Sequence, residues 1–217
     1  AVGGSYDLDD VISRLDRLLS ERHYDETGAL TMLQGDYAAL EYTYDSHGNT
    51  LTEATYGIAG ELVVSTRGYA MRACSYDAAG RLLTEAFFGA EGQPMVTSAG
   101  YARKEQTWNE QGFLTSEAWF GADDRYILQD GRYSYIHYVR DASGNCVEQG
   151  WYVFEGQPTL LADGYNRILR EFDAAGNCVK EAWYFNDGIV MIEGGYAAAT
   201  YTYDARGRLT QESYYDE

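Results

Sequence analysis

The chain has 217 residues, of which 16 are basic and 34 are acidic, so its net charge is −18. This excess of carboxylates repels phosphate groups and argues against nucleic acid as a partner. No apolar run reaches the roughly 18 residues that a membrane span needs, so membrane insertion is not expected.

The N-terminal segment is the one part that lacks a strand pattern. Apolar residues recur at helical spacing from Leu8 to Leu19, which predicts a helix over residues 6–22. We expect residues 1–22 to cap one end of the protein, because an uncovered strand edge invites aggregation. The chain stops at a turn signal, which suggests a fragment of a longer protein.

The rest of the chain, residues 23–217, is built from copies of one sequence unit. Asp173 has counterparts at Asp45, Asp77, Asn109, Asp141 and Asp204, which recur with a period of about 32 residues. Self-similarity at a fixed period is typical of repeat proteins, whose core lies between neighbouring copies. We therefore expect one continuous repeat domain.

Two turn signals divide each copy. The first is an aromatic residue followed by Asp-x-x-Gly, as in Phe172 to Gly176, and the second runs from an aromatic residue to Gly, as in Tyr184 to Gly188. Asp and Gly favour tight turns, and the stretch between the two signals is rich in strand-forming types. The pattern predicts an all-β array of antiparallel β-hairpins, with two or three strands per copy.

Three positions of the repeat are aromatic in nearly every copy. Two of them are adjacent on a strand, as in Trp183-Tyr184, so their side chains point to opposite faces. Two alternatives follow. Either stacked copies bury both rows, or the second row is exposed and binds a ligand. The third position, which we call the Tyr column, is Tyr in all six copies: Tyr37, Tyr69, Tyr101, Tyr133, Tyr165 and Tyr196.

The recurring carboxylates indicate structure and not catalysis. One Glu recurs in five copies, whereas acid–base work needs a single pair in differing environments. Each Asp turn offers one carboxylate, too few for the oxygen cage of Ca²⁺. We therefore expect no enzyme activity, no cofactor and no metal.

The three cysteines show neither zinc-ligand nor disulfide-framework spacing. Cys146 and Cys178 replace the Leu of other copies and are expected to be small buried residues. Neighbouring copies could also bring these two thiols close enough to pair.

Two resemblances are visible within a copy. Residues 201–210, YTYDARGRLT, resemble the YD repeat of rearrangement-hotspot proteins, which implies a long β-sheet of the kind that forms shells. Residues 183–188, WYFNDG, with Gly195-Tyr196 are similar to the aromatic-Gly hairpins of choline-binding and glucan-binding cell-surface proteins.

The second resemblance implies ligand-binding residues. In that family ligands lie between successive hairpins against two or three aromatic rings, where a cation or a sugar face would pack. The matching positions here are Trp119, Tyr133, Trp151, Tyr152, Tyr165, Trp183, Tyr184 and Tyr196.

The main functional hypothesis is a non-catalytic module of an extracellular or cell-surface bacterial protein that binds cell-wall or other glycan. The alternative is a structural spacer or shell segment of the YD type that has no ligand of its own. In both cases other domains of a longer chain are expected partners.

Overall fold

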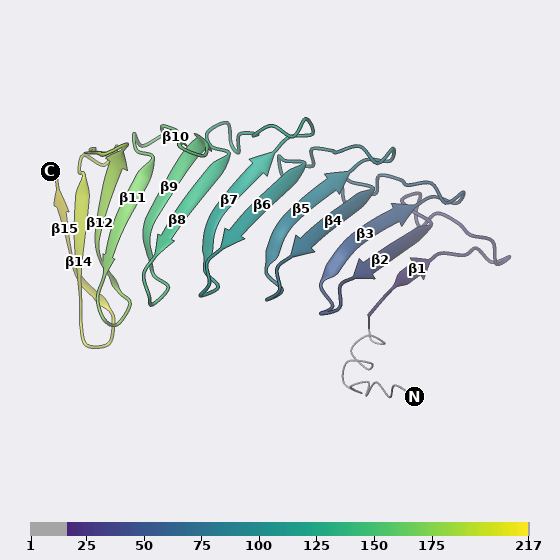
Figure 1. Ribbon diagram of the computed structural model, residues 1–217, viewed down its shortest axis with the longest axis horizontal. Helices are drawn as coiled ribbons and strands as arrows, with labels where there is room; N and C mark the ends of the chain where they lie inside the picture. The colour runs from purple at the N-terminus through teal and green to yellow at the C-terminus, as the bar shows by residue number, and fades with distance from the viewer. Residues whose placement is uncertain (1–16, 217) are drawn as a thin grey trace, which may run out of the picture. The chain divides into compact units, whose positions relative to one another are not determined.

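The protein is all-β and antiparallel, as predicted. The computed structural model describes residues 17–216, and strands are the only regular elements in that range (Figure 1). The chain forms two compact units, and the boundary between them lies between Arg103 and Lys104. The prediction of one continuous domain over residues 23–217 stays a prediction.

The first unit contains five strands that pair in sequence order, each antiparallel to the one before. They are β1 (Ser20–Arg22), β2 (Ala39–Tyr44), β3 (Thr50–Tyr56), β4 (Met71–Tyr76) and β5 (Leu82–Phe88).

The second unit continues the same plan from β6, which begins at the division. Its long strands pair in the order β6-β7-β8-β9-β11-β12-β14-β15, and short strands β10 and β13 pair with β9 and β12. The bounds are β6 (Arg103–Trp108), β7 (Leu114–Phe120), β8 (Tyr135–Arg140), β9 (Cys146–Phe154), β10 (Gln157–Pro158), β11 (Arg167–Phe172), β12 (Cys178–Phe185), β13 (Gly188–Ile189), β14 (Ala198–Tyr203) and β15 (Leu209–Tyr215).

The two-strand hairpin is the unit that repeats. In each of the five hairpins β2–β3, β4–β5, β8–β9, β11–β12 and β14–β15, the register shifts next to the turn. Such a bulge is a defined feature of a strand pair, and its recurrence shows that the copies share backbone geometry as well as sequence.

The predicted Asp-x-x-Gly turns are confirmed. The Asp173 carboxylate accepts hydrogen bonds from the backbone N–H groups of Ala175 and Asn177, both at 2.9 Å. Its second oxygen accepts from the Asn177 side chain at 2.9 Å. Gly176 has a φ of 84°, a conformation that strains any residue with a Cβ.

A substitution of Gly176 tests this turn. Gly176→Ala is expected to lower the free energy of unfolding by roughly 1 to 2 kcal/mol, because the left-handed conformation costs that much for an L-residue. The added Cβ meets no atom closer than 3.8 Å, so the strain is purely conformational. Gly188→Ala is the control, since Gly188 has no positive φ and is exposed. In urea unfolding, this variant should leave the free energy of unfolding nearly unchanged. Equal losses for the two variants would contradict the prediction.

The turn carboxylates also predict how stability depends on pH. Hydrogen bonds from Asn177 lower the pKa of Asp173, with the side-chain bond contributing most and the backbone bond next. Side-chain hydrogen bonds from Asn49 and Asn145 likewise lower the pKa values of Asp45 and Asp141. A lowered folded-state pKa adds stability that is complete above the unfolded value of about 4. That stability is lost as the pH falls through the folded pKa. Urea unfolding from pH 7 down to pH 2 should show this loss, and Asp173→Asn should lessen it.

A third turn closes each copy, and the sequence analysis did not identify it. The backbone N–H of Leu161 donates to the Tyr165 carbonyl at 2.9 Å, and Gly164 between them has a φ of 87°. The same turn precedes every residue of the Tyr column. Its sequence signal is the Gly that directly precedes Tyr in four of the six copies.

The predicted N-terminal helix is wrong where the structure describes it. Residues 20–22 form β1, which pairs with residues 39–41 of β2, while residues 1–16 lie outside the described range. The repeat explains this strand. Glu21 stands one repeat period before Glu53, and the Tyr37 hydroxyl donates to it at 3.4 Å. Backbone pairing with β2 outweighs the local helical spacing of apolar residues.

Candidate functional site: the aromatic and glutamate ladders

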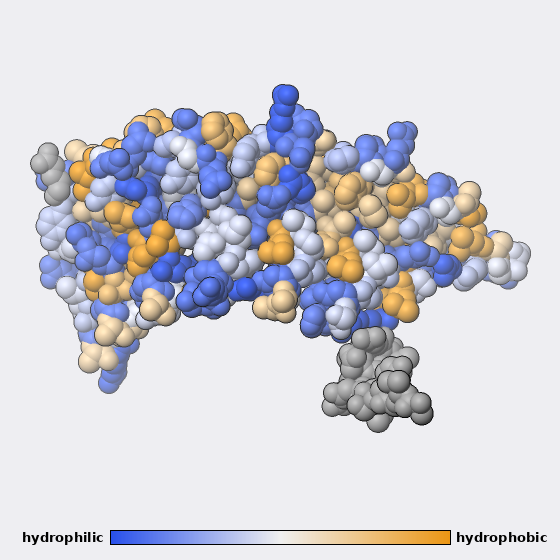
Figure 2. All heavy atoms as spheres, viewed as in Figure 1, coloured by the Kyte–Doolittle hydropathy of each residue, from blue (hydrophilic) through white to orange (hydrophobic). Residues whose placement is uncertain are grey.

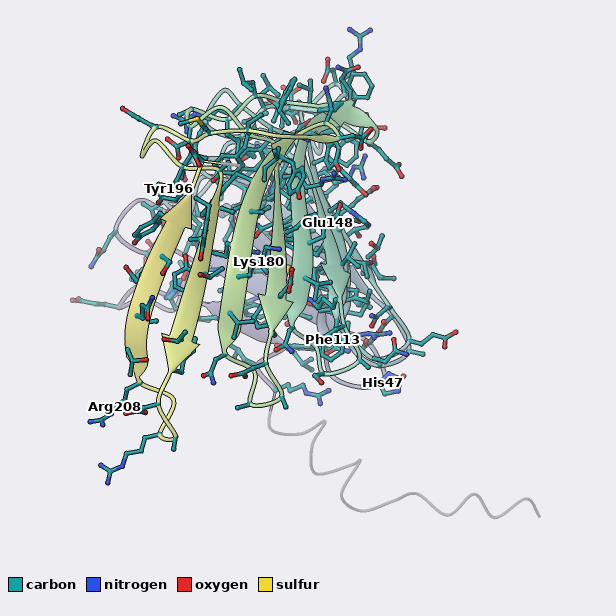
Figure 3. All side chains as sticks on the ribbon, turned by 90° about the vertical axis from the view of Figure 1, so that its left-hand side faces the viewer. His47, Phe113, Glu148, Lys180, Tyr196 and Arg208 are labelled. Atoms are coloured by element: carbon teal, nitrogen blue, oxygen red, sulfur yellow. The ribbon has the colours of Figure 1, made fainter. Side chains whose placement is uncertain are left out.

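The two adjacent aromatic rows lie on opposite faces of the strands. We call the face that carries Trp119, Trp151 and Trp183 the tryptophan face, and the face that carries Ala118, Gly150 and Ala182 the alanine face. Figure 3 shows Tyr196 and Glu148 projecting from opposite sides of the strands, the first on the tryptophan face and the second on the alanine face.

On the tryptophan face, each large ring packs against a Tyr of the following copy. The pairs are nearly perpendicular, with centroid separations of 5.8 Å for Trp119–Tyr133, 5.9 Å for Trp151–Tyr165 and 5.3 Å for Trp183–Tyr196. Edge-to-face contact of this kind stabilises a pair beyond its burial. These rings therefore join one copy to the next.

One well-buried part of the row surrounds Trp183, which is 7 % exposed. Ile168 and Ala199 complete the buried cluster, and Val190 and Ile192 pack against it from the segment that follows β12. In the first unit, Phe87 takes the same place between Tyr69 and Tyr101. The row on the tryptophan face is therefore covered by neighbouring copies around Trp183 and Phe87.

The alanine face carries the other two predicted ligand residues. Tyr152 contacts Tyr135 edge to face at 5.8 Å, and the guanidinium carbon of Arg167 lies 5.4 Å from the centre of the Tyr184 ring. The eight predicted binding residues are therefore divided six to two between opposite faces. No single surface joins them all.

Glutamates form a second ladder, on the tryptophan face beside the aromatic one. Each accepts a hydrogen bond from a Tyr hydroxyl of the following copy, at 3.0 Å for Glu85, Glu117 and Glu181. The preceding strand of the same hairpin supplies a further donor. Arg72 donates to Glu85 at 2.7 Å, Gln106 donates to Glu117 at 2.9 Å, and Arg170 donates to Glu181 at 2.8 Å.

This ladder also sets the ionisation of its tyrosines. Burial, followed by the neighbouring carboxylate, raises the pKa of Tyr138 and of Tyr201 far above the usual range for a phenol. Both hydroxyls therefore remain protonated donors at neutral pH. The recurring Glu is a hydrogen-bond acceptor between copies, and the absence of catalysis stays a prediction.

Other chemistry is sparse in the part of the chain that the structure describes. Within residues 17–216, no three His, Cys, Asp or Glu side chains gather as metal ligands would. Cys74 is buried, Cys146 and Cys178 are half-buried, and no disulfide links these three cysteines. Over the same range no helix is long and apolar enough to cross a membrane.

Comparisons with known proteins find similarity only among solved structures. No family model matches the chain, and no curated protein matches it. A crystal structure of TcdB2-TccC3-TEV aligns over 97 % of this chain with 18 % identity and a TM-score of 0.49. The Photorhabdus luminescens Tc holotoxin pore, with a TccC3 mutation, aligns over 81 % with 17 % identity and a TM-score of 0.43.

A crystal structure of TcdB2-TccC3-Cdc42 aligns over 89 % of the chain, with 14 % identity and a TM-score of 0.36. The present chain spans only 9 to 10 % of the length of the chains that it resembles.

Proposed function

We propose that this chain is a non-catalytic structural segment of a larger protein, a β-sheet spacer or wall with no ligand on its aromatic rows. One observation carries the proposal. The rings and carboxylates that a binding module would direct outward are instead engaged by the next copy, Trp183 by Tyr196 and Glu181 by Tyr201. Their chemistry is used in joining copies.

Exposed apolar residues support the same function. Over the side shown in Figure 2, hydrophobic residues occur in separate groups between hydrophilic ones. A ring that binds a ligand must be accessible, whereas Trp183 and Phe87 are each 7 % exposed and Trp119 and Trp151 are half-buried. An extracellular or cell-surface location remains part of the proposal.

A glycan-binding module is the second candidate, favoured by the two half-buried rings on the alanine face, Tyr152 and Tyr184. A pull-down on insoluble glucans and on bacterial cell walls, with and without excess choline, separates the two functions. The structural proposal predicts no retention on any matrix and an unchanged Trp fluorescence. Retention that Tyr152→Ala and Tyr184→Ala abolish would overturn it.

Mechanical measurement gives the structural proposal a positive test. Stretching the chain between its ends in a force spectrometer should release it in steps of whole copies, each adding about 110 Å of contour for about 32 residues. This is expected because each copy is joined to the next by its own set of ring and carboxylate contacts. Gradual lengthening at low force, without periodic steps, would contradict the proposal.

A further inference from the structure

A hollow of about 290 Å³ opens on the alanine face of the second unit. The small side chains of Ser116 and Ala118 line it on β7. Tyr126, Tyr135 and Glu155 contribute two rings and a carboxylate to the lining, and His137 on β8 also lines the hollow. Burial raises the pKa of the Tyr135 hydroxyl, and Ser116, Glu155 and Tyr126 lie close enough to influence that pKa.

The residues around this hollow depart from the repeat. Tyr126 stands where other copies have Leu62, Pro94 and Pro158. Tyr135 stands where they have Ala39, Met71, Arg103 and Arg167. His137 stands where they have Ala73, Glu105 and Leu169. These positions vary among the copies, and this copy alone places two phenol rings and an imidazole at them, around one hollow.

The next copy shows which chemical group such an environment accepts. Arg167, one repeat period after Tyr135, places its guanidinium over the Tyr184 ring at 5.4 Å. Glu148 and Asp187 flank that group at 3.6 and 3.8 Å. Asp187 is the repeat equivalent of Glu155. At the hollow, Glu155 retains the second of these carboxylates, whereas Ser116 replaces Glu148 and Tyr135 replaces the arginine.

Charge and ring exposure agree with this comparison. The hollow has carboxylates and no Lys or Arg among its lining residues, in a chain of net charge −18. Tyr126 stacks on Phe120 at 4.8 Å, has the Phe154 ring at 6.2 Å, and is still 40 % exposed. A bound planar cation is stabilised both by stacking on such a ring and by pairing with a carboxylate.

We propose that this hollow is a binding site for a guanidinium group from outside the chain, held between the Tyr126 and Tyr135 rings and paired with Glu155. The group could belong to a small free cation or to the arginine side chain of a polypeptide, because both present the same planar donors. The site is independent of the proposed structural role of the aromatic rows.

The test is a titration of the whole chain with agmatine and with an acetylated, amidated Gly-Arg-Gly peptide, followed by amide chemical shifts. Saturable shifts at Ser116 and His137 below about 10 mM are expected. Preference for agmatine would indicate a free cation, and preference for the peptide an arginine side chain. The absence of saturable shifts with both guanidinium probes would overturn the proposal, and shifts with cellobiose alone would point to a sugar instead.

Matched variants locate the site. Glu155→Gln and Tyr126→Leu should each weaken binding about tenfold, since each removes one of the contacts proposed to hold the guanidinium group. Glu91 is the repeat equivalent of Glu155 and is exposed in the first unit, so Glu91→Gln is the control and should leave binding unchanged. Equal weakening by Glu91→Gln would show a diffuse attraction to an acidic surface and would refute the site. Unchanged amide spectra away from the hollow would establish that each variant is folded.

Discussion

Trp183→Ala is expected to lower the free energy of unfolding by roughly 3 to 5 kcal/mol, the range found for removing a large aromatic residue from a core. Trp183 is 7 % exposed and packs against Ile168, Ala199 and Tyr196, so its removal leaves a cavity on the tryptophan face. Urea unfolding followed by far-UV circular dichroism measures the loss.

Tyr214 provides the control because it stands 31 residues after Trp183, at the same position of the last copy. It is 53 % exposed, and its ring contacts only Tyr196 among the aromatic contacts of the described chain. Tyr214→Ala should therefore lower the free energy of unfolding by less than about 1 kcal/mol. Similar losses for the two variants would show that the column does not form a buried ladder.

Glu85→Ala is expected to lower the free energy of unfolding by roughly 2 to 4 kcal/mol, because it removes the acceptor shared by two largely buried donors. The Glu85 side chain is 12 % exposed and accepts from Arg72 at 2.7 Å and from the Tyr101 hydroxyl at 3.0 Å. Without it the Arg72 guanidinium remains partly buried and uncompensated. Thermal and urea unfolding would both detect the loss.

An exposed pair of the same type separates burial from charge. Glu41 pairs with Arg22 at 2.6 Å, but the two side chains are 42 % and 45 % exposed, so Glu41→Ala should cost no more than about 1 kcal/mol. A double-mutant cycle of Glu85→Ala with Tyr101→Phe should give a coupling energy of about 1 kcal/mol. A coupling energy near zero would mean that the ladder does not join the copies.

The two ladders explain how a chain with so many aromatic residues forms a defined structure without a large central core. Each hairpin is short, and a two-stranded ribbon by itself is marginal in water. The following copy covers the ring at Trp151 with Tyr165 and satisfies the carboxylate at Glu117 with Tyr138. Stability therefore accumulates from one neighbour to the next, as in other repeat proteins.

Much of the fold follows from the sequence alone. The constant repeat period, the Asp-x-x-Gly turns and the alternation of Trp183 with Tyr184 predicted antiparallel hairpins with two differing faces. These features are local, because a turn depends on the φ preference of Gly and the hydrogen bonds of Asp within about four residues. The helix predicted for residues 6–22 failed at Ser20–Arg22, where the repeat position of Glu21 was a better guide than apolar spacing.

The tertiary structure decided which groups remain available for binding. Periodicity placed Trp119, Trp151 and Trp183 in one column but could not show that the Tyr of the next copy covers each ring. It also could not show that Tyr126 and Glu155, which belong to successive copies, lie around one hollow. The physical reason is that exposure depends on contacts between copies, which the side chains of one copy do not determine alone.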